Sequence, residues 1–389
     1  MRILQICHKP PFPDVDGGTK AEKMLTELLI EAGHQIDVFT IATEKHPFLE
    51  NEVPNWFSSQ GKIEYCQLKA MPNKIGAITT IFKDESYILS RFKSEVLKQQ
   101  LLKIDFQQYE TIVFDGLASA LFLDDIKQKS GKKIILRTHN IEFLVWQNLK
   151  KEVKNPIKST YFGIQSKKLE KQELNLFKSA DEIWHLNQEE INDFPNELKQ
   201  KVHFVPITLK LKKIPKLKSN THFKIGFMGA ANWQPNAEAF KFIQSKLALL
   251  AKENKIETVL AGRFQTSDLL QNPNVTNLGE VKSLEDFYQN IDAFINPIFS
   301  GSGLRIKILD AVQFMVPIVS SKKGIEGLGL EANVDYLPAE NVNEFLNQIL
   351  WLIKNQEKAK GLAQSAYQKI ETNFGIAQNI SLINNLLIK

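Results

Sequence analysis

The stretch 296–321 constrains the fold of this chain more than any other. Two short apolar runs, 291–295 and 316–319, flank a segment in which apolar residues recur at helical spacing. A turn that includes Gly301 and Gly303 precedes this helix. Strand, glycine turn, helix and strand in this order predict a parallel sheet, because parallel neighbours need a crossover connection.

The start of this helix has the features of an anion site. The first turn of a helix offers unpaired N–H groups and the positive end of the helix dipole. Arg305 and Lys307 add two positive charges at that same end, and an anionic ligand would relieve the conflict between like charges. Asp310, farther along the helix, could accept hydrogen bonds from sugar hydroxyls. Alternatively, the glycines form an ordinary turn, and Arg305 and Lys307 are solvated surface charges. These residues alone do not decide between an anion site and this alternative.

The rest of the chain has the same α/β character. Apolar runs typical of buried strands alternate with helical patterns, which predicts an α/β protein with doubly wound sheets. A lysine-rich segment broken by Pro215 is typical of a linker. The expected organisation is an amino-terminal domain at 1–206, a linker at 207–222, a carboxy-terminal domain at 223–372 and a terminal helix at 373–389.

Composition excludes several classes of protein. The chain has 389 residues with 43% hydrophobic, and its net charge of +5 is too mild to argue for nucleic acid binding. Both cysteines, Cys7 and Cys66, lie in apolar runs, so reduced thiols and a cytoplasmic location are expected. No apolar run is long enough to span a membrane. The sequence contains no metal-ligand spacing of His and Cys, no P-loop and no G-x-G-x-x-G.

Four further positions are candidates because of where they fall along the chain. Gly17 and Gly18 precede a predicted helix and form either an anion cradle or a plain turn. His139 follows a predicted strand at 133–137 and either hydrogen-bonds a ligand oxygen or caps the next helix. Arg263, also at the end of a strand, is a candidate for contacting a phosphate or a base.

Several separated motifs resemble those of the family-four retaining glycosyltransferases (glycosyl transferases group 1), which have the GT-B fold. S-G-S-G-L-R-I-K-I-L-D-A, followed by P-I-V-S-S and G-I-E-G-L, resembles the donor-site segment. R-T-H-N-I-E-F and G-A-A-N-W-Q-P-N-A resemble segments of one subgroup. The resemblance covers most of the chain and implies two Rossmann-like domains that face each other across a cleft, with the terminal helix crossing back onto the first domain.

This resemblance also implies a function. A sugar would pass from a nucleotide-sugar donor, expected to be a UDP-sugar, to a glycan or a lipid-linked acceptor, as in polysaccharide biosynthesis. The anomeric configuration would be retained, as in a hexosyltransferase of this family, and the reaction would need neither a metal ion nor a further cofactor.

The resemblance assigns roles to individual residues as well. Arg305 and Lys307, with the amides of Gly303 and Leu304, would hold the departing diphosphate. Asp310 matches the second acid of the family's Glu, seven residues, Glu motif and would bind the ribose. The remaining assignments are His139 to the donor sugar, Gly17 and Gly18 to the diphosphate, and V-T-N-L-G, which includes Leu278, to the base pocket.

The chain departs from the family pattern at two places. Ser302 stands where the first acid of the motif is expected, and Ala230, Ala231 and Asn232 replace an arginine and a lysine that hold phosphate in other members. Two alternatives therefore remain. One is a nucleotide-sugar isomerase or hydrolase of the same fold, with Asp115 and Glu142 as its acid–base candidates. The other is a degenerate protein that binds a nucleotide sugar without turnover.

The predicted helix at 155–179 is dense in lysine. A solvated basic face is the ordinary interpretation. Peripheral attraction to anionic lipid at the inner face of a membrane is the alternative.

Overall fold

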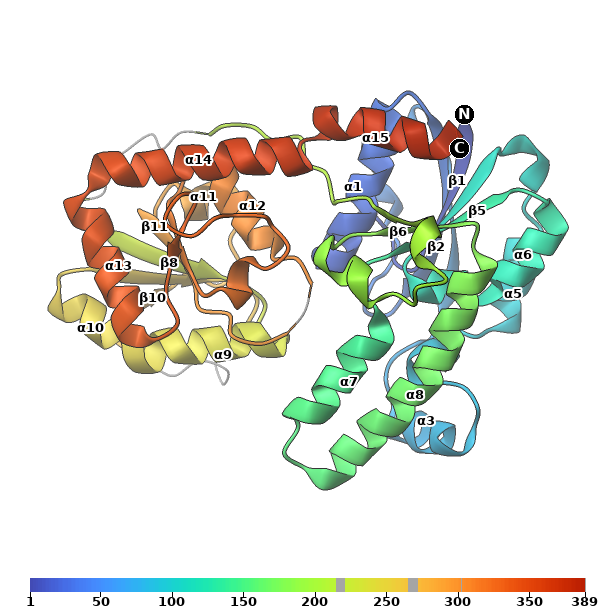
Figure 1. Cartoon of the computed structure of the whole chain (residues 1–389), viewed down its shortest axis with the longest axis horizontal. Coiled ribbons are helices and arrows are strands. Elements are labelled where there is room, and N and C mark those ends of the chain that lie inside the picture. Colours follow the sequence, from blue (N-terminus) through green and yellow to red (C-terminus); the bar gives the residue numbers. More distant parts are fainter. Residues whose placement is uncertain (215–220, 265–271, 302, 389) are drawn as a thin grey trace. The chain divides into compact units, whose positions relative to one another are not determined.

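A computed structural model describes residues 1–214, 221–264, 272–301 and 303–388 (Figure 1). The chain forms two compact units: unit 1 comprises Met1–Leu209 and Asn379–Lys389, and unit 2 comprises Lys210–Gln378. Part of the expected linker, 215–220, lies outside the described residues, and so does Ser302.

Unit 1 is built on a seven-stranded sheet with the order β3-β2-β1-β4-β5-β6-β7, in which every pair of neighbours is parallel. Its strands are β1 (Arg2–Cys7), β2 (Gln35–Thr43), β3 (Ile63–Leu68), β4 (Thr111–Asp115), β5 (Lys133–Thr138), β6 (Glu182–His185) and β7 (Val202–Phe204). Its α-helices are α1 (Gly17–Glu31), α2 (Asn55–Ser58), α3 (Lys74–Thr79), α4 (Tyr87–Ser90), α5 (Glu95–Leu102), α6 (Leu123–Ser130), α7 (Glu142–Glu152), α8 (Pro156–Ser179) and α15 (Ile376–Ile388). The order of the strands reverses between β1 and β4, where doubly wound sheets bind ligands.

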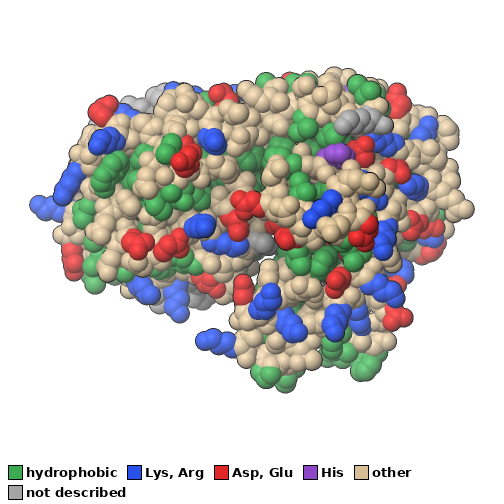
Figure 2. All heavy atoms as spheres, in the orientation of Figure 1, with side chains coloured by type: hydrophobic (Ala, Val, Ile, Leu, Met, Phe, Trp, Pro, Cys, Tyr) green, Lys and Arg blue, Asp and Glu red, His purple; other side chains and the backbone are tan. Residues whose placement is uncertain are grey.

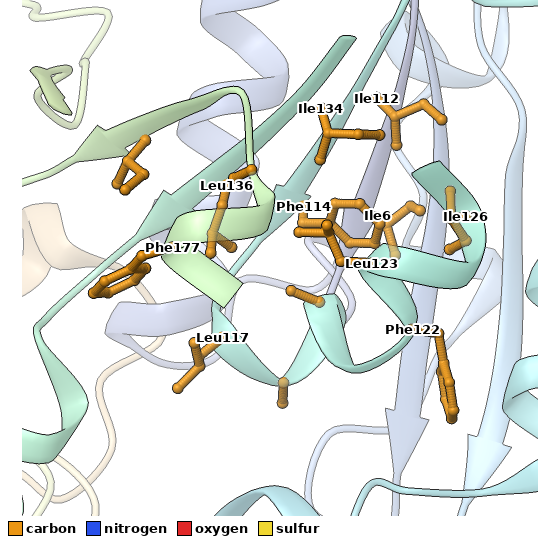
Figure 3. Close-up of a cluster of buried hydrophobic side chains, with 14 of the residues drawn as sticks. Ile6, Ile112, Phe114, Leu117, Phe122, Leu123, Ile126, Ile134, Leu136 and Phe177 are labelled. Atoms are coloured by element: carbon orange, nitrogen blue, oxygen red, sulfur yellow. The ribbon is translucent and has the colours of Figure 1, made fainter. Parts of the chain in front are cut away.

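Alternation along β1 explains how this sheet is covered on both faces. Leu4 and Ile6 belong to a buried cluster that also includes Phe114 of β4 and residues of α5, α6 and α8 (Figure 3). The side chain of Gln5 points to the opposite face, where it bonds to the Thr26 hydroxyl of α1 at 2.7 Å. One strand thus packs against helices on two sides, because its successive side chains alternate between the faces.

Unit 2 has a six-stranded parallel sheet with the order β10-β9-β8-β11-β12-β13. Its strands are β8 (Lys224–Met228), β9 (Glu257–Ala261), β10 (Val275–Asn277), β11 (Ala293–Asn296), β12 (Ile318–Ser320) and β13 (Leu337–Pro338). Its α-helices are α9 (Gln234–Phe242), α10 (Ala248–Glu253), α11 (Leu284–Tyr288), α12 (Ile306–Gln313), α13 (Val342–Lys354) and α14 (Gln356–Phe374). The two sheets confirm the predicted fold class of two doubly wound α/β domains.

The terminal helix α15 returns the chain from unit 2 to unit 1. Asn384 bonds His34 Nε2 at 2.7 Å, and the Leu386 carbonyl accepts a bond from Lys133 Nζ at 3.0 Å. Ile383, Leu386 and Leu387 are buried. None of the described helices combines the length and the apolar content that crossing a membrane requires.

One local expectation is wrong in detail. Helix α1 begins at Gly17 and not after Gly18, because Asp16 accepts bonds from the amides of Gly18 and Thr19 and so caps the helix there. In unit 2, Trp233 is the N-cap of α9, and Asn236 lies in the first turn of that helix. Residues 69–102 contain α3, the 3-10 turn Thr80–Phe82, α4 and α5.

We predict that Gly262→Ala destabilises unit 2 by about 2 kcal/mol or more. Gly262 has φ of +126°, and a Cβ atom there would meet the Gly229 carbonyl oxygen at 1.8 Å. Gly361→Ala is the matched control, since a Cβ at this position in α14 meets nothing within 4 Å. Because alanine favours helix, the control should gain up to about 1 kcal/mol. Denaturant unfolding would check both, and equal stability of the two variants would contradict the prediction.

Candidate active site

In each unit, the candidate residues lie at the carboxyl ends of the parallel strands. In unit 2, the strand order reverses between β8 and β11, and the loops that follow these two strands meet there. Gly301, in the loop after β11, approaches Pro235 and Trp233 so closely that an added Cβ would lie 2.7 Å from Pro235 Cγ. Gly301 and Gly303 have φ of +82° and +84°, a left-handed conformation that glycine adopts without strain. These loops lead into the first turn of α12.

Arg305 is the N-cap residue of α12, and its guanidinium folds back over the preceding loop. It donates to the carbonyls of Ser300 (3.3 Å), Gly301 (3.2 Å) and Gly303, and it lies 5.0 Å from the centre of the Trp233 ring. Burial lowers the pKa of Arg305 to about 10, so the group stays charged at neutral pH. In the described structure, Arg305 therefore organises the glycine loop.

Lys307 is the second residue of the helix and is half-buried. Its ammonium donates to Asn236 Oδ1 and lies 4.4 Å from the centre of the Phe227 ring. Among the described residues, no carboxylate lies within ion-pair distance of it. Burial, and then the charge of Arg305, lower the pKa of Lys307 to about 7, although the charge of Asp310 opposes this shift.

No described side chain caps the N-terminus of α12. This 8-residue helix therefore begins with two cations and with amide groups that none of the described side chains caps. The arrangement is unfavourable by itself, since like charges meet the positive end of the dipole. An anion bound at this helix end would make the arrangement favourable, because both the cations and the helix dipole attract it.

Other candidates of unit 2 lie along the same sheet edge. Asn236 connects the loop after β8 to α12, because its amide donates to the Ala230 carbonyl at 2.9 Å while it accepts from Lys307. Asp310 is buried on α12. Arg263 and Leu278 follow β9 and β10; both are exposed, and Arg263 pairs with Glu280 at 2.8 Å. Arg263 would have to exchange this surface partner for a ligand.

In unit 1, Asp115 ends β4 beside the point where the strand order reverses, and it is fully buried. Its carboxylate accepts bonds from Arg137 Nη1 (2.9 Å to each oxygen), Gln5 Nε2 (3.0 Å) and His139 Nε2 (2.9 Å). Burial alone would raise the pKa of Asp115, but Arg137 and His139 outweigh it and hold the pKa at about 2. Asp115 is therefore a permanent anion that orients His139.

His8 is a residue of this cluster that the sequence reasoning missed. Its Nδ1 lies 2.6 Å from Glu22 Oε1, a carboxyl group on α1 that is completely buried. The rings of His8 and His139 meet edge to face at 5.9 Å, and a Cβ on Gly116 would lie 2.2 Å from His8 Nδ1. Burial, and then the charge of Lys9, lower the pKa of His8 to about 4. Burial, and then Asp115, raise the pKa of Glu22, so both groups of this pair favour their neutral forms.

The signal for His8 was present in the sequence. His8 directly follows the first strand, as His139 follows the fifth, and parallel strands end at the same edge of a sheet. Glu22 gave no such signal, because it lies on the helical face that also carries buried apolar residues.

The expected anion site at Gly17 and Gly18 is occupied by a side chain of the protein itself. The Asp16 carboxylate accepts the amides of Gly18 (2.9 Å) and Thr19 (3.0 Å). The same carboxylate contacts His46 Nε2 at 2.8 Å and Lys9 Nζ at 3.2 Å. These partners lower the pKa of Asp16, in opposition to burial. A diphosphate could use this helix end only by displacing Asp16.

The structure thus brings the predicted residues together in two groups. Arg305, Lys307, Gly303, Leu304 and Asp310 lie on or beside the first turns of α12, with Arg263 and Leu278 on the same sheet edge of unit 2. His139, Gly17 and Gly18 belong to unit 1. Among the described residues, no group of His, Cys, Asp and Glu side chains is arranged to hold a metal ion.

Residues 222–355 match the family model described as glycosyl transferases group 1. The carboxy-terminal domain therefore resembles the group 1 glycosyltransferases. A Klebsiella pneumoniae protein described as an uncharacterized 44.6 kDa protein in the cps region is 23% identical to this chain over 390 residues, which covers 96% of each chain.

Solved structures show the same fold over the whole chain. Anabaena Alr3699/HepE in complex with UDP and glucose superimposes with a TM-score of 0.67 at 14% identity, covering 100% of both chains. Sucrose-phosphate synthase from Thermosynechococcus elongatus gives 0.70 at 16% identity, with 100% of this chain and 99% of that chain covered. The chain therefore has the GT-B fold.

We predict that Asp115→Asn destabilises unit 1 by about 3 kcal/mol, because it leaves the buried Arg137 without its anion. Since the folded pKa of Asp115 is depressed, its contribution is present above about pH 4 and is lost as the pH falls toward 2. The stability of the Asp115→Asn variant should therefore not show this part of the decrease at acid pH. Unfolding by denaturant across this pH range would measure it.

Asp125→Asn is the matched control. Asp125 pairs with Lys98 at 2.7 Å on the surface, where such pairs contribute less than about 1 kcal/mol. If Asp115→Asn and Asp125→Asn lowered the free energy of unfolding equally, the buried network around Asp115 would not stabilise unit 1 as predicted.

Proposed function

We propose that this glycosyltransferase transfers a sugar from a UDP-sugar to a glycan or lipid-linked saccharide acceptor, with retention of the anomeric configuration and without a metal ion. The observation that carries the proposal is the uncapped start of α12, where Arg305 and Lys307 stand beside unsatisfied amides at the switch point of the sheet. The group 1 family match of this domain supports sugar transfer. The solved relative that contains UDP supports the choice of nucleotide.

The chemistry follows from where charge develops. Cleavage of the sugar–phosphate bond places negative charge on the departing diphosphate, so fixed donors aimed at this charge stabilise the transition state. The amides of α12 and the ammonium of Lys307 are such donors. The guanidinium of Arg305 would transfer its bonds from the loop carbonyls to phosphate oxygens, and the loop would rearrange around the ligand.

Unit 1 would supply the contact to the donor sugar through His139. Burial lowers the pKa of His139, while the bond to Asp115 opposes this shift and fixes the ring orientation. Because Asp115 uses His139 Nε2, the Nδ1 atom is the one left to face a ligand oxygen. Asp310, buried on α12, would accept bonds from the ribose.

The alternative of a nucleotide-sugar isomerase or hydrolase receives little support from Asp115. A carboxylate with a pKa of about 2 that accepts bonds from three side chains cannot exchange protons near neutral pH. Glu142 is better suited, since burial raises its pKa. Donor hydrolysis that persists without acceptor would favour this alternative.

We predict that Lys307→Ala or Arg305→Ala lowers turnover by about 10²–10³ with the fold intact, as the loss of one fixed donor does in other charge-stabilising sites. Sugar transfer from UDP-sugars, measured by release of UDP in the presence of candidate glycan acceptors, would test this. Lys360→Ala, at an exposed position of α14 in the same unit, is the control and should leave turnover unchanged. Unchanged turnover in Lys307→Ala would refute the phosphate assignment, whereas UDP binding without any turnover in the unaltered protein would favour a degenerate binding protein.

We also predict a pH dependence of UDP affinity. The pKa of Lys307 is about 7, and a bound diphosphate favours the protonated form. Binding should therefore take up a proton above pH 7, and the affinity should weaken by up to about tenfold per pH unit there. Calorimetry in buffers of different ionisation enthalpy would detect the proton uptake, which should be absent from Lys307→Met. Equal proton uptake in both proteins would assign the effect to another group.

A further inference from the structure

Exposed hydrophobic side chains concentrate in two segments of unit 1, 69–83 and 149–158. Phe82 is 87% exposed, Ile157 80% and Ile75 76%. Met71, Ile78 and Leu149 in the same segments are also exposed. Nothing in the candidate active site uses any of these residues.

The two segments lie side by side around the helix pair α7 and α8. Lys168 of α8 donates to the carbonyls of Thr80 and Ile81 (2.7 Å to Ile81), which holds the α3 segment against α8. Helices α7 and α8 pack together through Trp146 and Phe162, whose rings lie 5.4 Å apart. Figure 1 shows α3 next to the lower half of this helix pair.

A cavity of about 300 Å³ lies between the segment 69–83 and the helix pair α7 and α8, and Pro72, Lys74, Ala77, Tyr87, Trp146 and Tyr161 line it. Leu149 follows Trp146 by three residues and Ile157 precedes Tyr161 by four, so each lies on the same helical face as its partner. The apolar lining of the cavity therefore continues outward onto the exposed hydrophobic residues. We call this continuous area the apolar–basic surface, made by residues 69–83 and 149–158 with Tyr87, Trp146 and Tyr161.

Lysines surround the exposed hydrophobic residues. The two segments contain seven lysines and one acidic residue, Glu152, and Asp84 and Glu85 follow only at the edge. The seven are Lys69, Lys74, Lys83, Lys150, Lys151, Lys154 and Lys158. On the face drawn in Figure 2, hydrophobic side chains form the lower edge of this part of the molecule, with Lys and Arg side chains just above them.

We propose that the apolar–basic surface docks the protein onto an anionic lipid bilayer. Isoleucine and phenylalanine side chains would enter the boundary between headgroups and acyl chains, while the lysines contact the anionic headgroups. Trp146, Tyr87 and Tyr161 are of the residue types enriched at this boundary. A protein partner fits less well, because protein interfaces are depleted in lysine. The proposal concerns a different surface from the sugar-transfer site and does not depend on it.

The test measures binding of the full-length protein to vesicles in the absence of donor and acceptor. Vesicles of phosphatidylcholine alone are compared with vesicles that also contain phosphatidylglycerol, by co-sedimentation at low and at high salt. We expect binding only to the anionic vesicles and a decrease with added salt. Binding to neither kind of vesicle, or equal binding to both, would overturn the proposal.

Two variants separate the apolar from the basic contribution. Ile75→Ser with Phe82→Ser should weaken binding at least about tenfold. Lys74→Glu, Lys150→Glu and Lys154→Glu together should weaken it by roughly a hundredfold or more, at about fivefold for each lysine removed. The matched controls in unit 2 are Leu249→Ser with Val334→Ser, and Lys252→Glu, Lys282→Glu and Lys358→Glu, all at exposed positions. If the control sets weakened binding as much, the surface would be wrongly assigned.

A second measurement does not depend on the variants being folded to the same extent. A polarity-sensitive fluorophore on Ile78→Cys should shift to the blue on addition of anionic vesicles, and the same label on Val334→Cys should not. Both native cysteines are buried, which limits labelling to the new thiol. An unshifted label at residue 78, with binding observed, would show that another part of the protein contacts the lipid.

Discussion

Parallel pairing of the strands is the constraint on which the candidate site depends. Every described strand in both sheets is parallel to its neighbours, so the loops that follow the strands all emerge at one edge of their sheet. Residues far apart in the chain meet there for this reason alone. In unit 1 these are His8, Asp115 and His139. In unit 2, Gly229 meets Gly262 and Trp233 meets Arg305. Reversal of the strand order opens a place at that edge where loops diverge and a ligand can reach the backbone.

Charged groups at the candidate site are paired differently in the two units. In unit 1, a buried carboxylate is fully satisfied, because Asp115 accepts bonds from Arg137, Gln5 and His139. In unit 2, positive charge accumulates at the start of α12, and no carboxylate of the described residues is in ion-pair contact with Lys307. The network around Asp115 holds His139 in position, whereas the start of α12 is stabilised when an anion binds.

The sequence predicted the segment from β11 through α12 to β12 correctly, because glycine turns and helical periodicity are local signals. It placed Arg305 and Lys307 at the helix start, and the structure has them there as the N-cap and the second helical residue. It did not reveal that Asp16 already occupies the amides beside Gly18, or that Arg305 bonds the loop before it. Both facts depend on side-chain orientation, which residue spacing does not encode. His8 and Glu22 were missed for a related reason, since the contact between them needs α1 to fold back across β1.

The sequence by itself therefore determined the fold class and the order of the elements, since periodicity and motif order are properties of the chain. Only the tertiary structure decided which polar groups are paired. It showed a satisfied network around Asp115, an uncapped α12, and an apolar–basic surface built from segments 149–158 and 69–83. Hydrogen-bond partners and shared surfaces arise from contacts between distant segments, and a linear pattern does not record such contacts.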